Sequence, residues 1–373
     1  MNIALIGYFK SDAVNGIALA GYHLAKHLIL QGHEVFIYYF SQKRADCIDD
    51  EGIHYRYFKQ SYKGVYLDKD FVTFLKKNPD QIEIFHLHSV FNLYNYHISK
   101  VLRKNGFPQV LTPHGGYSPQ LLQRKFLLKK LFFWLFEKEV IRNAHGMILV
   151  QEKELDDVRN VGFLGKVKVI PNPLPLDSLH HLARVPVNSK QMHYLLYLGR
   201  FDMEHKGLDL LLRTFKILSQ YRSDIHLFLY GDGKDRKDLE DLVETLDIPR
   251  VKINAPVYGQ EKLKVIDECL LYIQPSRWEV FGMSIIEAMV MGRPVVVSEG
   301  CYLAETLEKN AVGLVIPLEE NVAAELILGY INNTRSLRNE GDKGKKFALA
   351  HYDPAIVARK TLEYYQEILI SHV

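Results

Sequence analysis

The chain has 373 residues, three cysteines and a formal net charge of +3 at pH 7. One hydrophobic core rarely grows to this size, so two domains are expected, and so small a net charge argues against a protein dedicated to nucleic acid. Cys47, Cys269 and Cys301 lack the paired spacing of a zinc site or a disulfide framework, which fits a reducing cytoplasm. No stretch approaches the roughly 18 apolar residues of a membrane-spanning helix, and the apolar start at residues 2–9 is expected to form a buried strand rather than a signal peptide.

The first half of the chain alternates apolar strand patterns with helical ones. Buried strands joined by helices are typical of a parallel sheet with right-handed crossovers, so residues 1–172 are expected to form one doubly wound α/β domain. Residues 41–70 and 89–100 are expected to be loops. The strand and helix patterns fall at residues 2–9, 17–32, 33–40, 82–89, 108–116, 146–151 and 166–172.

A proline-rich stretch without periodicity then predicts a linker at residues 173–190. Residues 191–354 repeat the strand and helix alternation, which predicts a second doubly wound domain. The last helix, at about 355–373, is expected to pack back on the first domain. Ligands of open parallel sheets bind beyond the carboxyl ends of the strands, so the chemistry is expected in those loops, at a cleft between the two domains.

Two cations follow the first strand of the second domain. In "YLGRFDMEHKGLD", Arg200 and Lys206 occupy the loop between that strand and the next helix. A guanidinium and an ammonium at this edge suit a diphosphate, whose growing negative charge they stabilise. Ordinary solvated loop cations are the alternative.

The segment "PSRWEVFGMSIIEAMV", which begins at Pro275, places Glu279 before a turn and a helix expected to start at Ser284. The amides of Phe281, Gly282 and Met283 at such a helix start can bind a phosphate or sugar oxygens. Glu279 can accept hydrogen bonds from sugar hydroxyls. Glu287 lies three residues after Ser284, so it either completes a capping box or binds a ligand.

Weaker signals come from three further turns. His114 in "LTPHGG" ends a first-domain strand, where it either contacts a sugar or is satisfied by neighbouring backbone. Gly16, in "SDAVNGIA", precedes a helix, and Gly231 in "YGDG" borders the expected nucleotide site. The sixteen histidines show no metal-ligand spacing, so a site without a metal ion is expected.

Residues 121–142 predict a helix with Arg124, Lys125, Lys129 and Lys130 among large apolar side chains. Such a helix either contacts an anionic membrane surface or is buried against its own domain. The unbroken apolar run at 131–136 spreads around the helix, which favours burial.

The segments "GRFDMEHKG", "YGDG", "VYG" and "PSRWEVFGMSIIEAMVMGRPVVVS" occur in the order and spacing typical of the retaining nucleotide-sugar glycosyltransferases of the GT-B fold, the family 4 group. The chain resembles this family over nearly its whole length, and most strongly at residues 194–298. The chain departs from the usual pattern at two places. The family commonly has two adjacent glycines where this chain has Asn15-Gly16, and it usually has a glycine where this chain has Pro173.

The resemblance implies that Arg200 and Lys206 hold the donor diphosphate and that Glu287 binds the ribose hydroxyls. By the same resemblance, Glu279 and the amides of residues 281–283 bind the donor sugar, and His114 lies beside the reacting sugar. Gly16 is implied near the diphosphate or the acceptor. The implied donor is a nucleotide-diphosphate sugar, with no cofactor and no metal ion.

The function expected from the resemblance is hexose transfer, with retention of configuration, to a glycan or lipid-linked acceptor in cell-surface polysaccharide or glycolipid biosynthesis. The enzyme is expected in the cytoplasm, peripherally at the inner face of the cell membrane if residues 121–142 contact it. A nucleotide-sugar 2-epimerase is a second hypothesis, but first-domain acid/base carboxylates are not evident. A non-catalytic sugar-nucleotide-binding subunit is a third, and His114 argues against it.

Overall fold

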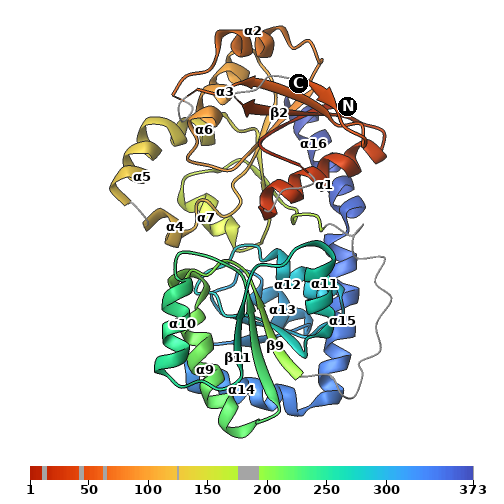
Figure 1. Ribbon diagram of the computed structural model, residues 1–373. Helices are drawn as coiled ribbons and strands as arrows, with labels where there is room; N and C mark the ends of the chain where they lie inside the picture. Colours follow the sequence, from red (N-terminus) through yellow and green to blue (C-terminus); the bar gives the residue numbers. More distant parts are fainter. Residues whose placement is uncertain (11–14, 42–45, 62–64, 124–125, 175–192, 373) are drawn as a thin grey trace. The chain divides into compact units, whose positions relative to one another are not determined.

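The computed structural model describes residues 1–10, 15–41, 46–61, 65–123, 126–174 and 193–372 (Figure 1). The chain forms two compact units, Met1–Pro175 with Tyr352–Val373, and Leu176–His351. Each unit has its own sheet and its own apolar core. The linker predicted at 173–190 lies outside the described residues from residue 175 onward.

The described part of the first unit contains an eight-stranded sheet in the order β3-β4-β2-β1-β5-β6-β7-β8. All neighbouring strands are parallel except β3 and β4. The chain runs outward from β1 through β2 and then continues on the opposite side of β1 with β5, so the strand order reverses between β1 and β5. The strands are β1 Asn2–Ile6, β2 Glu34–Ser41, β3 Cys47–Ile48, β4 His54–Lys59, β5 Ile84–His88, β6 Gln109–Thr112, β7 Gly146–Leu149 and β8 Lys166–Val169.

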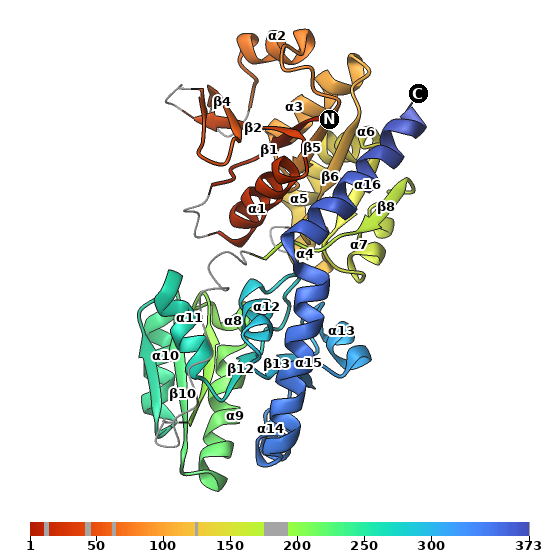
Figure 2. The same ribbon diagram turned by 90° about the vertical axis from the view of Figure 1, so that its right-hand side faces the viewer.

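Helices cover both faces of this sheet because successive strand residues point to opposite sides. Ile3 and Leu5 of β1 share a core with α1 and α16, whereas Ala4 and Ile6 share one with α2, α3, α6 and α7. The C-terminal helix α16 lies against α1 (Figure 2). These helices are α1 Gly16–Leu30, α2 Lys69–Lys77, α3 Leu93–Lys104, α6 Lys138–Asn143, α7 Glu154–Asn160 and α16 Pro354–His372.

The second unit contains a six-stranded parallel sheet in the order β11-β10-β9-β12-β13-β14. Helices α9 and α14 pack together and share one core with its strands, while α12 contacts β12 and β13. The prediction of two doubly wound parallel-sheet domains is therefore confirmed. The elements are β9 His193–Leu198, α8 Met203–Lys206, α9 Leu208–Tyr221, β10 Ile225–Tyr230, α10 Arg236–Thr245, β11 Val251–Asn254, α11 Gly259–Glu268, β12 Leu271–Gln274, α12 Met283–Val290, β13 Val295–Ser298, α13 Ala304–Asn310, β14 Leu314–Ile316, α14 Glu320–Asn332 and α15 Thr334–Tyr352.

The expectation of loops at 41–70 and 89–100 is wrong for much of both ranges. The first contains β3 and β4, and β4 pairs with β2 along its whole length. The second contains most of α3, whose start is capped by Asn92 through a 2.9 Å hydrogen bond to the amide of Tyr94. Ile98 and Leu102, four residues apart, then face the core.

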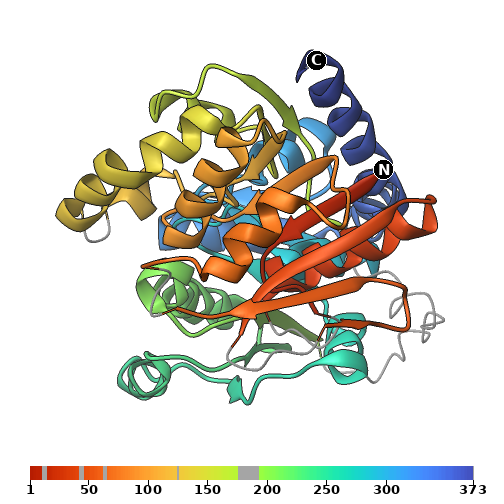
Figure 3. The same ribbon diagram turned by 90° about the horizontal axis from the view of Figure 1, so that it is seen from above.

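The helix predicted at 121–142 is formed by all the described residues of this range, in α4 Pro119–Gln123, α5 Phe126–Phe132, a π turn at Phe133–Glu137 and α6, the last three following one another without a break. The expectation of burial is wrong for much of its apolar run, since Leu131 is 58% exposed and Trp134 63%. This part of the first unit lies on the side away from the C-terminus (Figure 3). Arg124 and Lys125 lie outside the described residues. Among the helices described, none is both long and apolar enough to cross a membrane.

Candidate active site

Lys206 and Glu279 form an ion pair at the carboxyl edge of the second sheet. Lys206 ends α8, and Glu279 lies in the loop between β12 and α12. Their side chains are only 13% and 15% exposed, so the pair is shielded from water. Gly207 makes this approach possible, because it adopts φ +63° and a Cβ there would lie 2.1 Å from the carbonyl oxygen of Pro275.

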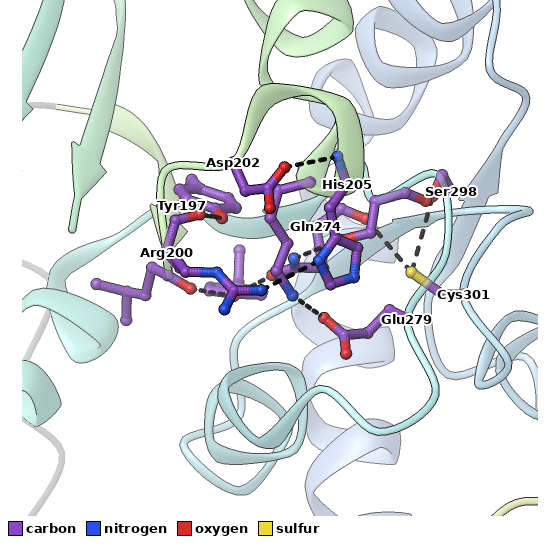
Figure 4. Close-up of polar contacts among 12 residues, drawn as sticks. Tyr197, Arg200, Asp202, His205, Gln274, Glu279, Ser298 and Cys301 are labelled. Atoms are coloured by element: carbon purple, nitrogen blue, oxygen red, sulfur yellow. Dashed lines mark hydrogen bonds and ion pairs between the residues drawn. The ribbon is translucent and has the colours of Figure 1, made fainter. Parts of the chain in front are cut away.

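Arg200 approaches the same place from the end of β9. Its Nη2 lies 3.3 Å from Nδ1 of His205, and the His205 ring stacks on Trp278 with centroids 4.2 Å apart. Burial, with Lys206 nearby, lowers the pKa of His205 to about 4, so this imidazole is neutral at physiological pH. Arg200, His205 and Glu279 gather at one place (Figure 4).

A buried polar network supports the loop that carries Glu279. Gln274 donates to Ser276 Oγ at 2.8 Å, and Ser298 donates to the Ser276 carbonyl. The Glu279 amide donates to the Gly300 carbonyl at 3.2 Å, and its carbonyl accepts from the amide of Tyr302 at 2.8 Å. The backbone of Glu279 is thus fixed on both sides.

Helix α12 begins at Met283, one residue before the predicted start, with Gly282 as its N-cap. The capping box, one of the two alternatives for Ser284 and Glu287, is not formed, because α12 begins at Met283 and Ser284 lies inside the helix. No side chain in the described part of the chain therefore caps the first-turn amides of α12, which lie at the positive end of the helix dipole. A Cβ on Gly282 would lie 3.5 Å from Cγ of Glu279, so this helix start adjoins the ion pair.

Glu287 instead forms an ion pair with Lys262 of α11. The Glu287 side chain is 7% exposed and that of Lys262 is 23% exposed. Lys262 was missed in the sequence, since only the packing of α11 beside α12 brings it to Glu287.

Gly231 lies against the end of β9. A Cβ at this position would lie 1.9 Å from the carbonyl oxygen of Gly199, so only glycine fits. Arg236 donates to the Gly231 carbonyl at 3.1 Å. The contact of Gly231 with a nucleotide stays a prediction.

His114 and Gly16 belong to the first unit. His114 adopts a left-handed backbone with φ 50°, and its Nε2 lies 3.0 Å from Nδ1 of His88. Burial lowers the pKa of His114 to about 4. Gly16 begins α1 after Asn15, whose Oδ1 accepts from the amide of Ile17 at 2.9 Å.

Two buried carboxylates hold the loops of this unit, and both were missed in the sequence. Glu154 accepts from the Gly115 amide at 2.6 Å and from the Val150 amide at 2.7 Å. Glu137 accepts from the Phe91 amide and the Tyr117 hydroxyl at 2.9 and 2.6 Å. Burial raises the pKa of each to about 7. Both oxygens of each carboxylate accept hydrogen bonds from the protein. Glu137 and Glu154 therefore support loops and do not form an acid/base pair.

No group of three or more His, Cys, Asp or Glu side chains in the described residues is arranged to hold a metal ion.

Residues 14–178 match the family described as Glycosyltransferase Family 4, and residues 183–347 match Glycosyl transferases group 1. The chain belongs to the group 1, family 4 type of glycosyltransferases. This membership, like the GT-B fold, was predicted from the sequence and is confirmed.

An uncharacterised glycosyltransferase of Bacillus subtilis is 25% identical over 272 residues, which cover 70% of this chain and 72% of the relative. Sucrose-phosphate synthase from Thermosynechococcus elongatus superposes with a TM-score of 0.77 at 21% identity, covering 99% of each chain. HepE of Anabaena, solved in complex with UDP and glucose, superposes with a TM-score of 0.71 at 18% identity, covering 98% of this chain and 99% of HepE. At these identities the two solved structures show the shared fold.

Proposed function

We propose that this glycosyltransferase moves a hexose-type sugar from a nucleotide-diphosphate sugar to a glycan or lipid-linked acceptor, with retention of configuration. The observation that carries the proposal is the Lys206–Glu279 ion pair beside the uncapped start of α12, with Arg200 nearby. Two cations and a helix amino terminus form a site for an anion that gains charge as it leaves.

The donor site is assigned to the second unit. Arg200 and Lys206 hold the diphosphate, while Glu279 and the amides of Phe281, Gly282 and Met283 bind the sugar. Glu287, held in place by Lys262, binds the ribose hydroxyls, and Gly231 borders the nucleotide. The complex of HepE with UDP and glucose supports this class of ligand.

The transfer proceeds on the face of the sugar from which the diphosphate departs. The acceptor oxygen forms a bond to the anomeric carbon as the bond from that carbon to the phosphate oxygen breaks. The acceptor proton passes to the departing phosphate oxygen, and nucleoside diphosphate leaves. Glu279 is ion-paired with Lys206 and so is poorly placed to act as a nucleophile. The cations take the part that a metal ion plays elsewhere, so a chelator is expected to leave the rate unchanged.

The first unit is assigned to the acceptor, with His114 beside the reacting sugar and Gly16 near the diphosphate or the acceptor. His114 is neutral because burial lowers its pKa, so it acts as a hydrogen-bonding group. A product in cell-surface polysaccharide or glycolipid biosynthesis is consistent with such an acceptor.

We also propose that α5 and the following π turn rest on the anionic inner face of the cell membrane, with the enzyme in the cytoplasm. Leu127, Leu131 and Trp134 are 79%, 58% and 63% exposed. Lys130 lies 5.6 Å from the Phe126 ring centroid and Lys138 lies 4.6 Å from that of Trp134, so cations border the apolar surface. This combination suits a surface that is both apolar and negatively charged.

The test is incubation of purified protein with UDP-, GDP-, ADP- and TDP-sugars, with and without glycan and lipid-linked acceptors. Acceptor-dependent release of nucleoside diphosphate supports transfer. Donor interconversion without an acceptor supports an epimerase, and donor binding without turnover supports a non-catalytic subunit; either result would refute the proposal.

A further inference from the structure

The loop after β9 and the loop after β12 are tied together one residue before each member of the ion pair. The Arg277 amide donates to the His205 carbonyl at 3.0 Å. The rings of His205 and Trp278 stack, with centroids 4.2 Å apart and planes inclined by 17°. Lys206 follows His205 and Glu279 follows Trp278, so this stack fixes how closely the two loops that carry the ion pair approach each other.

Two features restrict the His205 ring. Trp278 is only 8% exposed, so its ring has little room to turn away from the stack. The His205 amide donates to Oδ1 of Asp202 at 3.1 Å, and this cap at the start of α8 holds the backbone of the histidine. The plane of the imidazole is therefore set by the protein before any ligand arrives.

The imidazole in turn holds the side chain of Arg200. The Tyr197 hydroxyl donates to the Arg200 carbonyl at 3.0 Å, which fixes the backbone, but Arg200 as a whole is exposed. A long exposed side chain samples many rotamers. The 3.3 Å contact between its Nη2 and Nδ1 of His205 restricts that sampling (Figure 4).

This contact requires a neutral histidine. A guanidinium has only donors, so Nδ1 of His205 has to accept and the ring proton has to lie on Nε2. Burial, with Lys206 nearby, lowers the pKa of His205 to about 4, so Nδ1 carries no proton at physiological pH. The contact uses one N–H of the Arg200 fork, and the remaining donors of a guanidinium suit phosphate oxygens.

The ring nitrogen separates this arrangement from ordinary packing. A stack on Trp278 needs only a flat ring, and phenylalanine would supply one. Histidine adds an acceptor close to the point where Arg200 leaves the sheet. A cation that is already oriented loses less conformational freedom when its ligand binds.

We propose that His205 is a positioning residue, held by Trp278, that orients the Arg200 guanidinium toward the diphosphate of the donor. This role rests on the proposed function, because it takes the ligand of Arg200 to be a diphosphate. A nucleoside monophosphate has no second phosphate group, so it should gain less from an oriented Arg200.

Calorimetric titration of the full chain compares the diphosphates of uridine, guanosine, adenosine and thymidine with the matching monophosphates. His205→Phe keeps a ring on Trp278 but removes Nδ1, so it is expected to lower the ratio of diphosphate to monophosphate affinity about tenfold. His205→Asn, whose side-chain oxygen can accept in place of Nδ1, is expected to keep most of that ratio. His193→Phe, at the opposite end of β9 from Arg200, is the matched control and should leave the ratio unchanged.

A double-variant comparison shows whether His205 acts through Arg200. In an Arg200→Ala background, His205→Phe should cause no further loss of the ratio, because the group that it orients is gone. A histidine that only packed the loop would add its effect to that of Arg200→Ala. His205→Leu also removes the accepting nitrogen, so the comparison is made with either variant that circular dichroism shows to be folded.

The inference is overturned if folded His205→Phe or His205→Leu keeps the wild-type ratio, if His205→Asn loses as much as His205→Phe, or if His205→Phe deepens the loss in Arg200→Ala. Loss of the diphosphate preference in Lys206→Met, with the preference kept in the His205 variants, would overturn the inference and leave the proposed function intact. A diphosphate preference that depends on His205, with no sugar transferred to any acceptor, would refute the proposed function and leave the positioning role standing.

Discussion

His88 and His114 lie with Nδ1 and Nε2 3.0 Å apart and with their rings inclined by only 20°. Burial lowers the pKa of His114 to about 4 and that of His88 well below its usual range, so both are neutral at physiological pH. A neutral imidazole carries one N–H, so one ring donates and the other accepts. Each ring therefore fixes the tautomer of the other, and of the two outer nitrogens one is a donor and the other an acceptor.

This pair predicts a pH-dependent contribution to stability. The folded pKa of His88 lies below the unfolded value of 6.5, so the contribution is complete above pH 6.5 and is lost as the pH falls below it. Replacing His88 by Asn should reduce the slope of unfolding free energy against pH, by up to about 1.4 kcal/mol per unit between pH 5 and 6.5.

Urea unfolding of wild type and His88→Asn at several pH values measures that slope. Glu137 and Glu154 have raised folded pKa values, which give a slope of opposite sign. Both chains carry these carboxylates, so they cancel in the comparison. Parallel stability curves for the two chains would contradict the prediction.

Glu154 should position the His114 loop through its hydrogen bond to the Gly115 amide. Glu154→Gln turns one acceptor oxygen into an amide donor, which should cost about 1–3 kcal/mol of stability and lower turnover. Thermal unfolding and initial rates check this, with Asp156→Asn on the exposed side of α7 as the control. Unchanged stability and turnover in Glu154→Gln would show that this carboxylate does not hold the loop.

Lys262 should matter because it neutralises the buried carboxylate of Glu287. Lys262→Met leaves that charge unpaired and should destabilise the second unit by about 1–3 kcal/mol, while Lys262→Met with Glu287→Gln should recover part of the loss. Glu287→Gln alone should raise the KM for the donor more than it lowers kcat, because ribose contacts act in binding. Equal unfolding free energies of the two Lys262 variants would argue against the pairing.

The exposed surface on α5 and the π turn should bind anionic vesicles. Replacing Leu131 and Trp134 by Ser is expected to reduce co-sedimentation with phosphatidylglycerol vesicles several-fold, and Lys130→Glu to do so mainly at low salt. Leu326→Ser is the control, because Leu326 is 40% exposed on α14 of the second unit. Equal sedimentation with purely zwitterionic vesicles, or no loss in the double variant, would refute membrane contact.

Local pattern was sufficient for most strands and helices, because alternating and helical periods follow directly from burial. It was not sufficient at 121–142, where the π turn adds a residue to the helical turn and changes the direction of the residues after it. Glu137 ends that turn and reaches inward to the Phe91 amide and the Tyr117 hydroxyl. No local periodicity encodes such a contact.

The candidate site likewise combines residues that sequence motifs predict with contacts that only the folded structure creates. Although the ion pair between them was not predicted, Lys206 and Glu279 were both identified from motif and spacing, because both follow strands that end at one sheet edge. The partner of Glu287 was not, since Lys262 comes from another helix. The cap was also misjudged: Ser284 and Glu287 have capping-box spacing, but α12 begins at Met283, so Ser284 lies inside the helix.

If Lys206, Arg200 and the start of α12 hold a diphosphate, calorimetric titration should distinguish nucleoside diphosphates from the matching monophosphates. A diphosphate is expected to bind more tightly than its monophosphate, and Lys206→Met is expected to abolish most of this difference, whereas Lys309→Ala, at an exposed position of α13, is expected to keep it. Turnover of Lys206→Met should fall about 10²–10³-fold. A folded Lys206→Met variant that binds the diphosphate and turns over like the wild type would show that Lys206 does not hold the diphosphate.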